Sequence, residues 1–231
     1  MLVIGHRGAG GLAHENTLEA LRAGLEAGAD ILEFDVRITK DGVPVLAHDF
    51  HTIRTHHDFS IISHHTLSEL RRRLFEFPII TLEEVLDEFF GVILLNIEVK
   101  GRGSGKGAAG FVKKQYIKKP ADWDNILFSS FNGNELRAIR KVSKQANLSL
   151  LHFENPFLFI AYQRSLQLTA VGFHRLYVNS FALLIAKKVG LFTYAYTVDR
   201  PQAAVLLAQE GVEGVVTNYP DRVLEAIRRS S

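Results

Sequence analysis

Short apolar runs alternate with amphipathic stretches along nearly the whole chain, the pattern of repeated strand–helix units around a parallel sheet. Eight strands are predicted, near Leu2–Gly5, Ile31–Ile38, Ile93–Val99, Ile126–Ser129, Ser149–Phe153, Thr169–Gly172, Phe192–Thr197 and Gly214–Thr217. Eight helices are predicted between and after them, over Thr17–Glu26, Leu82–Phe90, Ala108–Lys118, Asn134–Gln145, Pro156–Leu166, Phe181–Val189, Pro201–Gln209 and Pro220–Arg228. This order predicts an α/β fold, a (β/α)8 TIM barrel. The length fits such a barrel, so residues 1–231 are expected to form a single domain.

One segment interrupts the rhythm. Residues 43–81 are far more than a loop between a strand and a helix usually needs. Within it, Val43–His48 is predicted to be an extra extended piece after the turn at Asp41-Gly42. A small insertion, about residues 50–77, then separates the second strand from the second helix, and in a barrel it would lie over the C-terminal mouth.

The composition excludes several classes of protein. The chain has no cysteine, so neither disulfides nor thiolate ligands are available. The N-terminus has no long apolar run, so we expect a cytoplasmic enzyme without a stable membrane anchor. Residues 100–231 carry the excess of basic residues, but these are scattered at helical spacing except around residues 113–119. No nucleic-acid partner is therefore expected, and the oligomeric state is not indicated.

Two neighbouring predicted strands carry acidic side chains on one face. Side chains alternate across a strand, so Glu33, Asp35 and Arg37 share a face of the second strand, and Glu98 and Lys100 share a face of the third. Three convergent carboxylates predict a site for a hard divalent cation, Mg²⁺ or Ca²⁺. In the alternative interpretation, Arg37 and Lys100 neutralise the acids and no metal is needed.

A glycine-rich segment, residues 5–11, directly follows the first strand. Its backbone can approach a phosphate closely, and Arg7 suits a phosphate oxygen. His6 in this segment and His48 after the second strand are both expected at the C-terminal mouth. Two imidazoles around one phosphate can supply the acid and the base that hydrolysis of a diester needs.

Several motifs, in this order, resemble the glycerophosphodiester phosphodiesterase family. They are Gly-His-Arg-Gly-Ala (5–9), Glu-Asn-Thr (15–17), the long block at 28–49 that ends in Ala-His-Asp, Ile-Glu-Val-Lys (97–100), Ser-Ser-Phe (129–131), Tyr-Thr-Val-Asp (196–199) and Thr-Asn-Tyr-Pro (217–220). They span nearly the whole chain, and the block of residues 28–49 is the most specific of them.

The resemblance implies metal-dependent hydrolysis of small glycerophosphodiesters to an alcohol and sn-glycerol 3-phosphate. It implies that His6 and His48 form the catalytic acid–base pair. It also implies a set of other roles: metal ligands at Glu33, Asp35 and Glu98, and phosphate contacts at Arg7 and Lys100. Phe131 and Tyr196 follow strands, so we expect them to line the substrate side of the mouth.

The chain departs from the family pattern at four places, where it has His14 in place of Pro, Tyr196 in place of Trp, Asp199 in place of Asn and Asn218 in place of Asp. None removes a proposed catalytic group. The change at Tyr196 falls on an aromatic residue expected to line the substrate, so it puts the substrate preference in question.

Three other interpretations remain open at this point. A lysophospholipase D-like activity on longer lipids would need a wide apolar mouth, to which Phe59, Ile61, Ile62 and residues 157–160 could contribute. A catalytically silent phosphate-binding barrel would predict the loss of a histidine or an acid from the site. All seven positions with a proposed catalytic, metal or phosphate role are intact: His6, Arg7, Glu33, Asp35, His48, Glu98 and Lys100. The insertion's histidines (His51, His56, His57, His64 and His65) could bind Zn²⁺ or Ni²⁺, although their irregular spacing favours solvent-exposed residues.

Overall fold

The fold is a closed barrel. In the computed structural model, which describes residues 1–74 and 77–230, eight parallel strands follow one another in the order β1-β9-β8-β7-β6-β5-β4-β2, and β1 pairs with β2 to close the ring. The strands are β1 (Leu2–Gly5), β2 (Ile31–Ile38), β4 (Leu94–Val99), β5 (Ile126–Ser130), β6 (Asn147–His152), β7 (Ala170–His174), β8 (Phe192–Tyr196) and β9 (Gly214–Thr217). The predicted (β/α)8 barrel is therefore confirmed.

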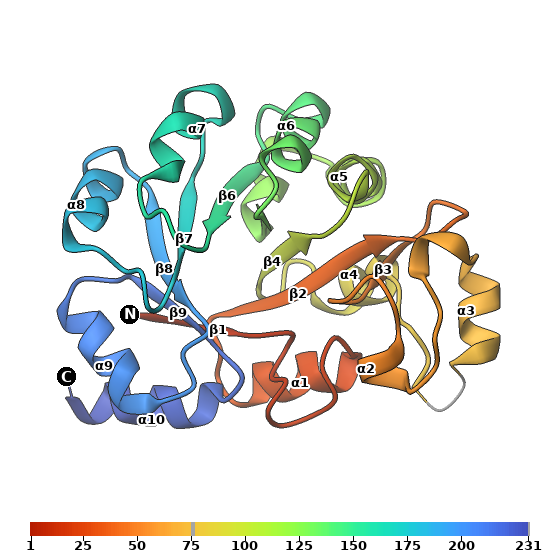
Figure 1. The fold of residues 1–231 in the computed structure, drawn as a ribbon, viewed down its shortest axis with the longest axis horizontal. Coiled ribbons are helices and arrows are strands. Elements are labelled where there is room, and N and C mark those ends of the chain that lie inside the picture. The colour runs from red at the N-terminus through yellow and green to blue at the C-terminus, as the bar shows by residue number, and fades with distance from the viewer. Residues whose placement is uncertain (75–76, 231) are drawn as a thin grey trace.

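The helices that follow these strands surround the barrel (Figure 1). They are α1 (Leu18–Glu26), α4 (Leu82–Phe89), α5 (Ser104–Gln115), α6 (Gly133–Val142), α7 (Leu158–Leu166), α8 (Ser180–Lys188), α9 (Pro201–Gln209) and α10 (Pro220–Ser230). Side-chain oxygens of Thr17, Thr81, Asn132 and Asn179 cap α1, α4, α6 and α8, because each accepts a hydrogen bond from a free amide of the first turn. None of the helices in the described ranges is both long and apolar enough to cross a membrane.

Side chains alternate between the two faces of each strand, so the hydrophobic core has an outer and an inner part. Outward side chains of β2 and β4, such as Phe34 and Ile97, pack with the helices in the larger cluster. Ile4, Leu127 and Tyr194 belong to a smaller cluster inside the barrel. This inner cluster fills the barrel below the mouth, so polar inward side chains near the strand ends are held on a packed base.

The insertion has structure of its own and projects to one side of the barrel beyond β2 (Figure 1). It contains β3 (Pro44–Leu46), antiparallel to β2, then α2 (Ile53–His56), the 3₁₀ helix η1 (Ile62–His64) and α3 (Leu67–Arg73). Another 3₁₀ helix, η2 (Pro120–Asn125), precedes β5. Val45, Ile62 and Leu70 form a small separate core. Ile62 is therefore buried and cannot line an apolar mouth, and residues 75 and 76 of the predicted insertion lie outside the described residues.

Candidate active site

Three carboxylates meet inside the barrel near its C-terminal mouth. Neighbouring strands β2 and β4 run parallel with Asp35 opposite Glu98, and Glu33 lies one inward position earlier on β2. Their side chains offer oxygen atoms that all lie within 4.8 Å of one another. The alternation of side chains along the two strands therefore brings together the acids that the sequence placed on one face.

The charges around these acids are unevenly balanced. The Lys100 ammonium lies 2.5 Å from Glu98 Oε1 and 3.3 Å from Asp35 Oδ1, and the Arg7 guanidinium lies 3.4 Å from Asp35 Oδ2. Among the described residues, Glu33 accepts a hydrogen bond only from the Arg7 backbone N–H, at 2.8 Å, and its buried Oε1 has no partner. Lys100 thus neutralises the cluster in part, as the alternative interpretation required, but no salt bridge within the described ranges reaches Glu33.

The acidity of the group reflects this imbalance. Burial, followed by the charge of Asp35, raises the pKa of Glu98 to about 7. Burial and the two neighbouring carboxylates raise the pKa of Glu33 well above its ordinary value. A divalent cation would satisfy the unpartnered Glu33 oxygen and offset the repulsion among the acids, so this set of oxygen donors fits a hard metal ion such as Mg²⁺ or Ca²⁺.

Asp35 is fixed in place by a residue whose role the sequence did not indicate. Asn16 donates to Asp35 Oδ2 and accepts from the Asp35 backbone N–H, both at 3.0 Å. The Asn16 backbone has φ 57°, a left-handed conformation that asparagine tolerates better than most residues. The Glu-Asn-Thr motif thereby acquires a physical meaning, because Thr17 caps α1 and Asn16 orients the central carboxylate.

The glycines in the segment after β1 allow close backbone packing, in addition to the close approach of a phosphate that the sequence indicated. A Cβ at Gly5 would lie 2.0 Å from the Gly8 carbonyl oxygen, and one at Gly8 would lie 2.4 Å from the Ala20 backbone. Gly8 also has φ 86°. These glycines allow the segment to turn tightly against α1, which presents His6 and Arg7 at the mouth.

His6 is held by a hydrogen-bonded pair that follows the last two strands. Asn218 Oδ1 lies 2.8 Å from His6 Nδ1, and the Asn218 amide donates to Asp199 Oδ2 at 2.8 Å. Because the amide nitrogen faces Asp199, its oxygen must accept from His6 Nδ1–H, which leaves Nε2 as the basic nitrogen. Burial, with the nearby Arg7 charge, lowers the pKa of His6 to about 4.

The same pair explains two departures from the family pattern. The family pattern has Asn and Asp where this chain has Asp199 and Asn218, and the structure places these side chains in direct contact. The amide and the carboxylate are exchanged within one hydrogen-bonded pair. The carboxylate consequently lies one residue further from the His6 ring.

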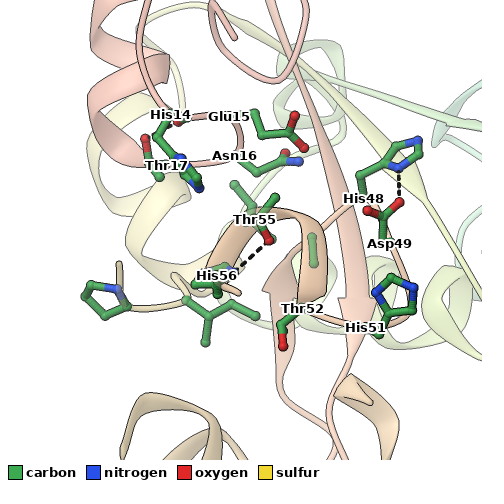
Figure 2. Close-up of a pocket in the computed structure, with 14 residues that line it drawn as sticks. His14, Glu15, Asn16, Thr17, His48, Asp49, His51, Thr52, Thr55 and His56 are labelled. Carbon is green, nitrogen blue, oxygen red and sulfur yellow. Dashed lines mark hydrogen bonds and ion pairs between the residues drawn. The ribbon is translucent and has the colours of Figure 1, made fainter. Parts of the chain in front are cut away.

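His48 is fixed from both ends. Its Nδ1 lies 2.7 Å from Asp49 Oδ1, as the dashed line in Figure 2 marks. Its backbone carbonyl accepts two hydrogen bonds from the Arg37 guanidinium, at 2.9 and 2.7 Å. Arg37 therefore positions the His48 segment and forms no ion pair with the acids within the described residues. Burial lowers the pKa of His48, and the Asp35 and Asp49 carboxylates oppose that effect.

Arg54 of the insertion ties these groups together. It donates to Asp49 Oδ2 at 2.7 Å and to both Glu15 oxygens at 2.6 and 2.8 Å, while Arg7 donates to Glu15 at 2.7 Å. Although burial opposes it, hydrogen bonds from His48 and Arg54 lower the pKa of Asp49 to about 2. A continuous chain of charges thus joins Arg7, Glu15, Arg54, Asp49 and His48, and we call it the ionic chain.

Phe131 and Tyr196 lie beside the acids. Their rings meet edge to face at 5.7 Å, and the Lys100 ammonium lies 5.8 Å from the centre of the Phe131 ring. The Tyr196 hydroxyl donates to the His152 carbonyl at 2.6 Å. Both aromatic residues therefore border the acidic cluster on the side away from the insertion.

The insertion borders the mouth on the other side. Figure 2 shows His14, Glu15, Asn16 and Thr17 facing the segment from His48 to His56 across a pocket. The insertion's histidines are not uniformly exposed, because His51, His56 and His65 are half-buried. In the part of the chain that the structure describes, no three of them approach as metal ligands; only the acidic cluster does so.

The fold and its charged mouth place the chain among the (β/α)8-barrel enzymes, whose sites lie at the C-terminal ends of the strands. Residues 6–222 match the model of the glycerophosphoryl diester phosphodiesterase family. The chain belongs to this family.

Individual relatives agree with that membership. A glycerophosphodiester phosphodiesterase of Caldanaerobacter subterraneus subsp. tengcongensis is 30% identical over 99% of this chain and 98% of its own length. The structure of an Oleispira antarctica phosphodiesterase in complex with the product sn-glycerol-3-phosphate is similar with a TM-score of 0.85, at 26% identity over 99% of this chain and 97% of that one. A Thermotoga maritima glycerophosphodiester phosphodiesterase is similar with a TM-score of 0.81, at 28% identity over 97% of both chains.

Proposed function

We propose that the protein hydrolyses glycerophosphodiesters to an alcohol and sn-glycerol 3-phosphate, with Glu33, Asp35 and Glu98 as the ligands of Mg²⁺ or Ca²⁺. The observation that carries this proposal is the joint placement of three converging carboxylates and two fixed histidines at one barrel mouth. A bound cation would supply a Lewis acid for the phosphate oxygens. A catalytically silent barrel is disfavoured, because no histidine or acid of the set is missing.

His6 and His48 divide the proton transfers. His6 has its Nδ1 proton committed to Asn218, so its Nε2 suits the base that takes a proton from the attacking hydroxyl or water. His48 has a carboxylate, Asp49, on its Nδ1, which stabilises the imidazolium and suits the acid that protonates the leaving oxygen. Arg7 and Lys100 are both only about 15% exposed and lie beside the acids, where they would hold the phosphate.

Release of glycerol 3-phosphate from a panel of glycerophosphodiesters tests this function. We expect release with Mg²⁺ or Ca²⁺ present and its loss on chelation. Absence of glycerol 3-phosphate with every diester and either ion would refute the proposal.

The exchanged pair at Asp199 and Asn218 predicts a change in pH dependence. Asp199→Asn combined with Asn218→Asp moves the carboxylate onto His6, which favours the imidazolium and raises the pKa of His6 by about one unit. A base must be neutral to act, so the acidic limb of the kcat/KM profile should shift to higher pH by about the same amount. Asn134→Asp, an exposed change on α6, is the matched control. An unmoved limb in the double variant would remove His6 from the role of base.

The ionic chain predicts a specific effect of Arg54. Arg54→Gln removes the shared partner of Glu15 and Asp49, so Arg7 and His48 lose orientation and kcat/KM should fall roughly tenfold. The control is Arg22→Gln, because Arg22 forms a similar two-bond ion pair with Glu88, at 2.6 Å, on the exposed surface. Equal activity of the two variants would show that the insertion does not position the catalytic groups.

A further inference from the structure

The barrel mouth has two unlike sides. The side formed after β1 and β2 carries the ionic chain. The side formed by the segments that follow β5, β6 and β7 carries exposed apolar side chains. We call this second side the apolar wall, defined by Phe131, Phe153, Phe157, Leu176, Tyr177 and Phe181.

The wall is continuous with the proposed catalytic centre. From Phe131, which lies beside Lys100, a ring contact of 5.7 Å leads to Tyr196. The ring centres of Tyr196 and His174 are 6.0 Å apart, and those of His174 and Phe153 are 4.3 Å apart. A ligand whose phosphate lay at the acids would therefore meet an unbroken row of rings as it extended outward.

The outer part of the wall is open to solvent. Leu176 is 73% exposed, Phe181 is 62% exposed and Phe153 is 51% exposed. Phe153 lies 5.6 Å from Tyr177 between ring centres and so extends the row of rings, whereas Phe157 and Phe181, 6.2 Å apart, form a separate pair on the segments after β6 and β7. Apolar groups grouped at the rim of a site gain free energy when an apolar part of a ligand covers them.

The two imidazoles among these rings, His152 and His174, are uncharged near neutral pH. Burial lowers the pKa of His152 to about 4, and burial with the Arg175 charge lowers the pKa of His174. Two charged side chains flank the rings: Arg175, whose guanidinium donates to the Thr197 carbonyl at 2.9 Å, and the exposed Glu154. The exposed rings and Leu176 themselves favour a hydrocarbon over a charged head group.

We propose that the apolar wall binds the single acyl or alkyl chain of a lipid-derived glycerophosphodiester, such as a lysophospholipid, while the phosphate lies at the carboxylates and histidines. This inference rests on the proposed function and narrows its substrate class. A chain on the leaving alcohol leaves sn-glycerol 3-phosphate as the product, whereas a chain on the glycerol leaves an acylated glycerol 3-phosphate. The reaction balances as a hydrolysis: a water oxygen becomes bonded to phosphorus, the bond from phosphorus to the alcohol oxygen breaks, and that oxygen takes a proton.

The experiment compares kcat/KM of the metal-loaded full chain on three compounds below their micelle concentrations. Glycerophosphocholine carries no chain, a short-chain lysophosphatidylcholine carries it on the glycerol, and an N-acylated glycerophosphoethanolamine carries it on the leaving alcohol. We expect at least one chain-bearing compound to be favoured by roughly tenfold or more over glycerophosphocholine. The favoured compound identifies the end of the diester that faces the wall.

Substitutions in the apolar wall test whether the higher kcat/KM of the chain-bearing compound depends on the wall. Leu176→Ser and Phe181→Ser should each lower the ratio of kcat/KM with chain to kcat/KM without chain by about three- to tenfold. The control is Leu206→Ser on α9, where Leu206 is 60% exposed but lies outside the wall. A ratio that stays unchanged in both wall variants overturns the inference, as does a dimer of the chain that Phe181→Ser dissociates.

The two proposals fail differently. If glycerophosphocholine is hydrolysed at least as well as both chain-bearing compounds, the inference about the wall is wrong and the proposed function stands. If none of the three is hydrolysed with Mg²⁺ or Ca²⁺, both are wrong.

Discussion

His6→Ala and His48→Ala are each expected to lower kcat by about 10²–10⁴-fold on natural glycerophosphodiesters, with little change in KM. In the proposed mechanism, each variant removes one of the two proton transfers that cleavage of a diester with a poor leaving group requires. The double variant should be far less than multiplicatively worse, because the two imidazoles act in one reaction. His64→Ala, an exposed change in η1, is the control.

A nitrophenyl diester separates the two roles. Its leaving group departs without protonation, so it should restore much of the rate of His48→Ala and little of the rate of His6→Ala. If the nitrophenyl diester restored the rate of His6→Ala instead, His6 would be the acid and His48 the base. A single variant within a few-fold of the wild-type rate on natural diesters would contradict the two-histidine mechanism.

Loss of the divalent cation, by chelation or by Glu33→Gln or Glu98→Gln, is expected to reduce activity by at least about 10²-fold. Each substitution keeps the shape of the side chain and removes a negative ligand. The effect should also appear without turnover, because a bound ion stabilises the folded state. Mg²⁺ or Ca²⁺ should therefore raise the Tm of the wild type much more than that of either variant.

Glu33→Gln has a second expected result. Without metal, the variant should be at least as stable as the wild type, since it removes a buried carboxyl group that is surrounded by other carboxylates. Glu225→Gln on the exposed face of α10 controls for a general effect of charge. A metal-induced rise in the Tm of Glu33→Gln and Glu98→Gln equal to that of the wild type would place the ion elsewhere.

Strand periodicity made most of the barrel predictable. Leu2–Gly5, Ile31–Ile38 and Gly214–Thr217 are strands with the bounds expected from their apolar runs. The prediction for α5 was less accurate: its start was placed at Ala108, but the helix begins at Ser104. Glycines in its first turns argue against a helix locally, yet a Cβ at Gly105 would lie 2.4 Å from the Glu135 carbonyl oxygen. Close packing of α5 on α6 therefore requires the residue that weakens the local helix signal.

The candidate site was predictable only where local patterns determine it. Alternation along two strands was enough to bring Glu33, Asp35 and Glu98 together, whereas their roles remain predictions. The ionic chain could not be predicted, because Glu15 and Arg54 are 39 residues apart and no periodicity relates them. Helix α3 in the insertion had a readable signal, the capping box of Thr66 and Glu69, which the irregular histidines of that segment obscured.

The position of β1 links closure of the barrel to the orientation of His6. In the ring β1 lies between β2 and β9, so the pairing that closes the barrel joins two strands that are far apart in the chain. The hydrogen bond that holds the His6 ring spans the same distance along the chain, because its partner Asn218 lies 212 residues downstream. The carboxylates of β2 and β4, by contrast, come together through the pairing of neighbouring strands. The orientation of the His6 ring therefore depends on closure of the barrel, because its partner Asn218 follows the strand that pairs with β1.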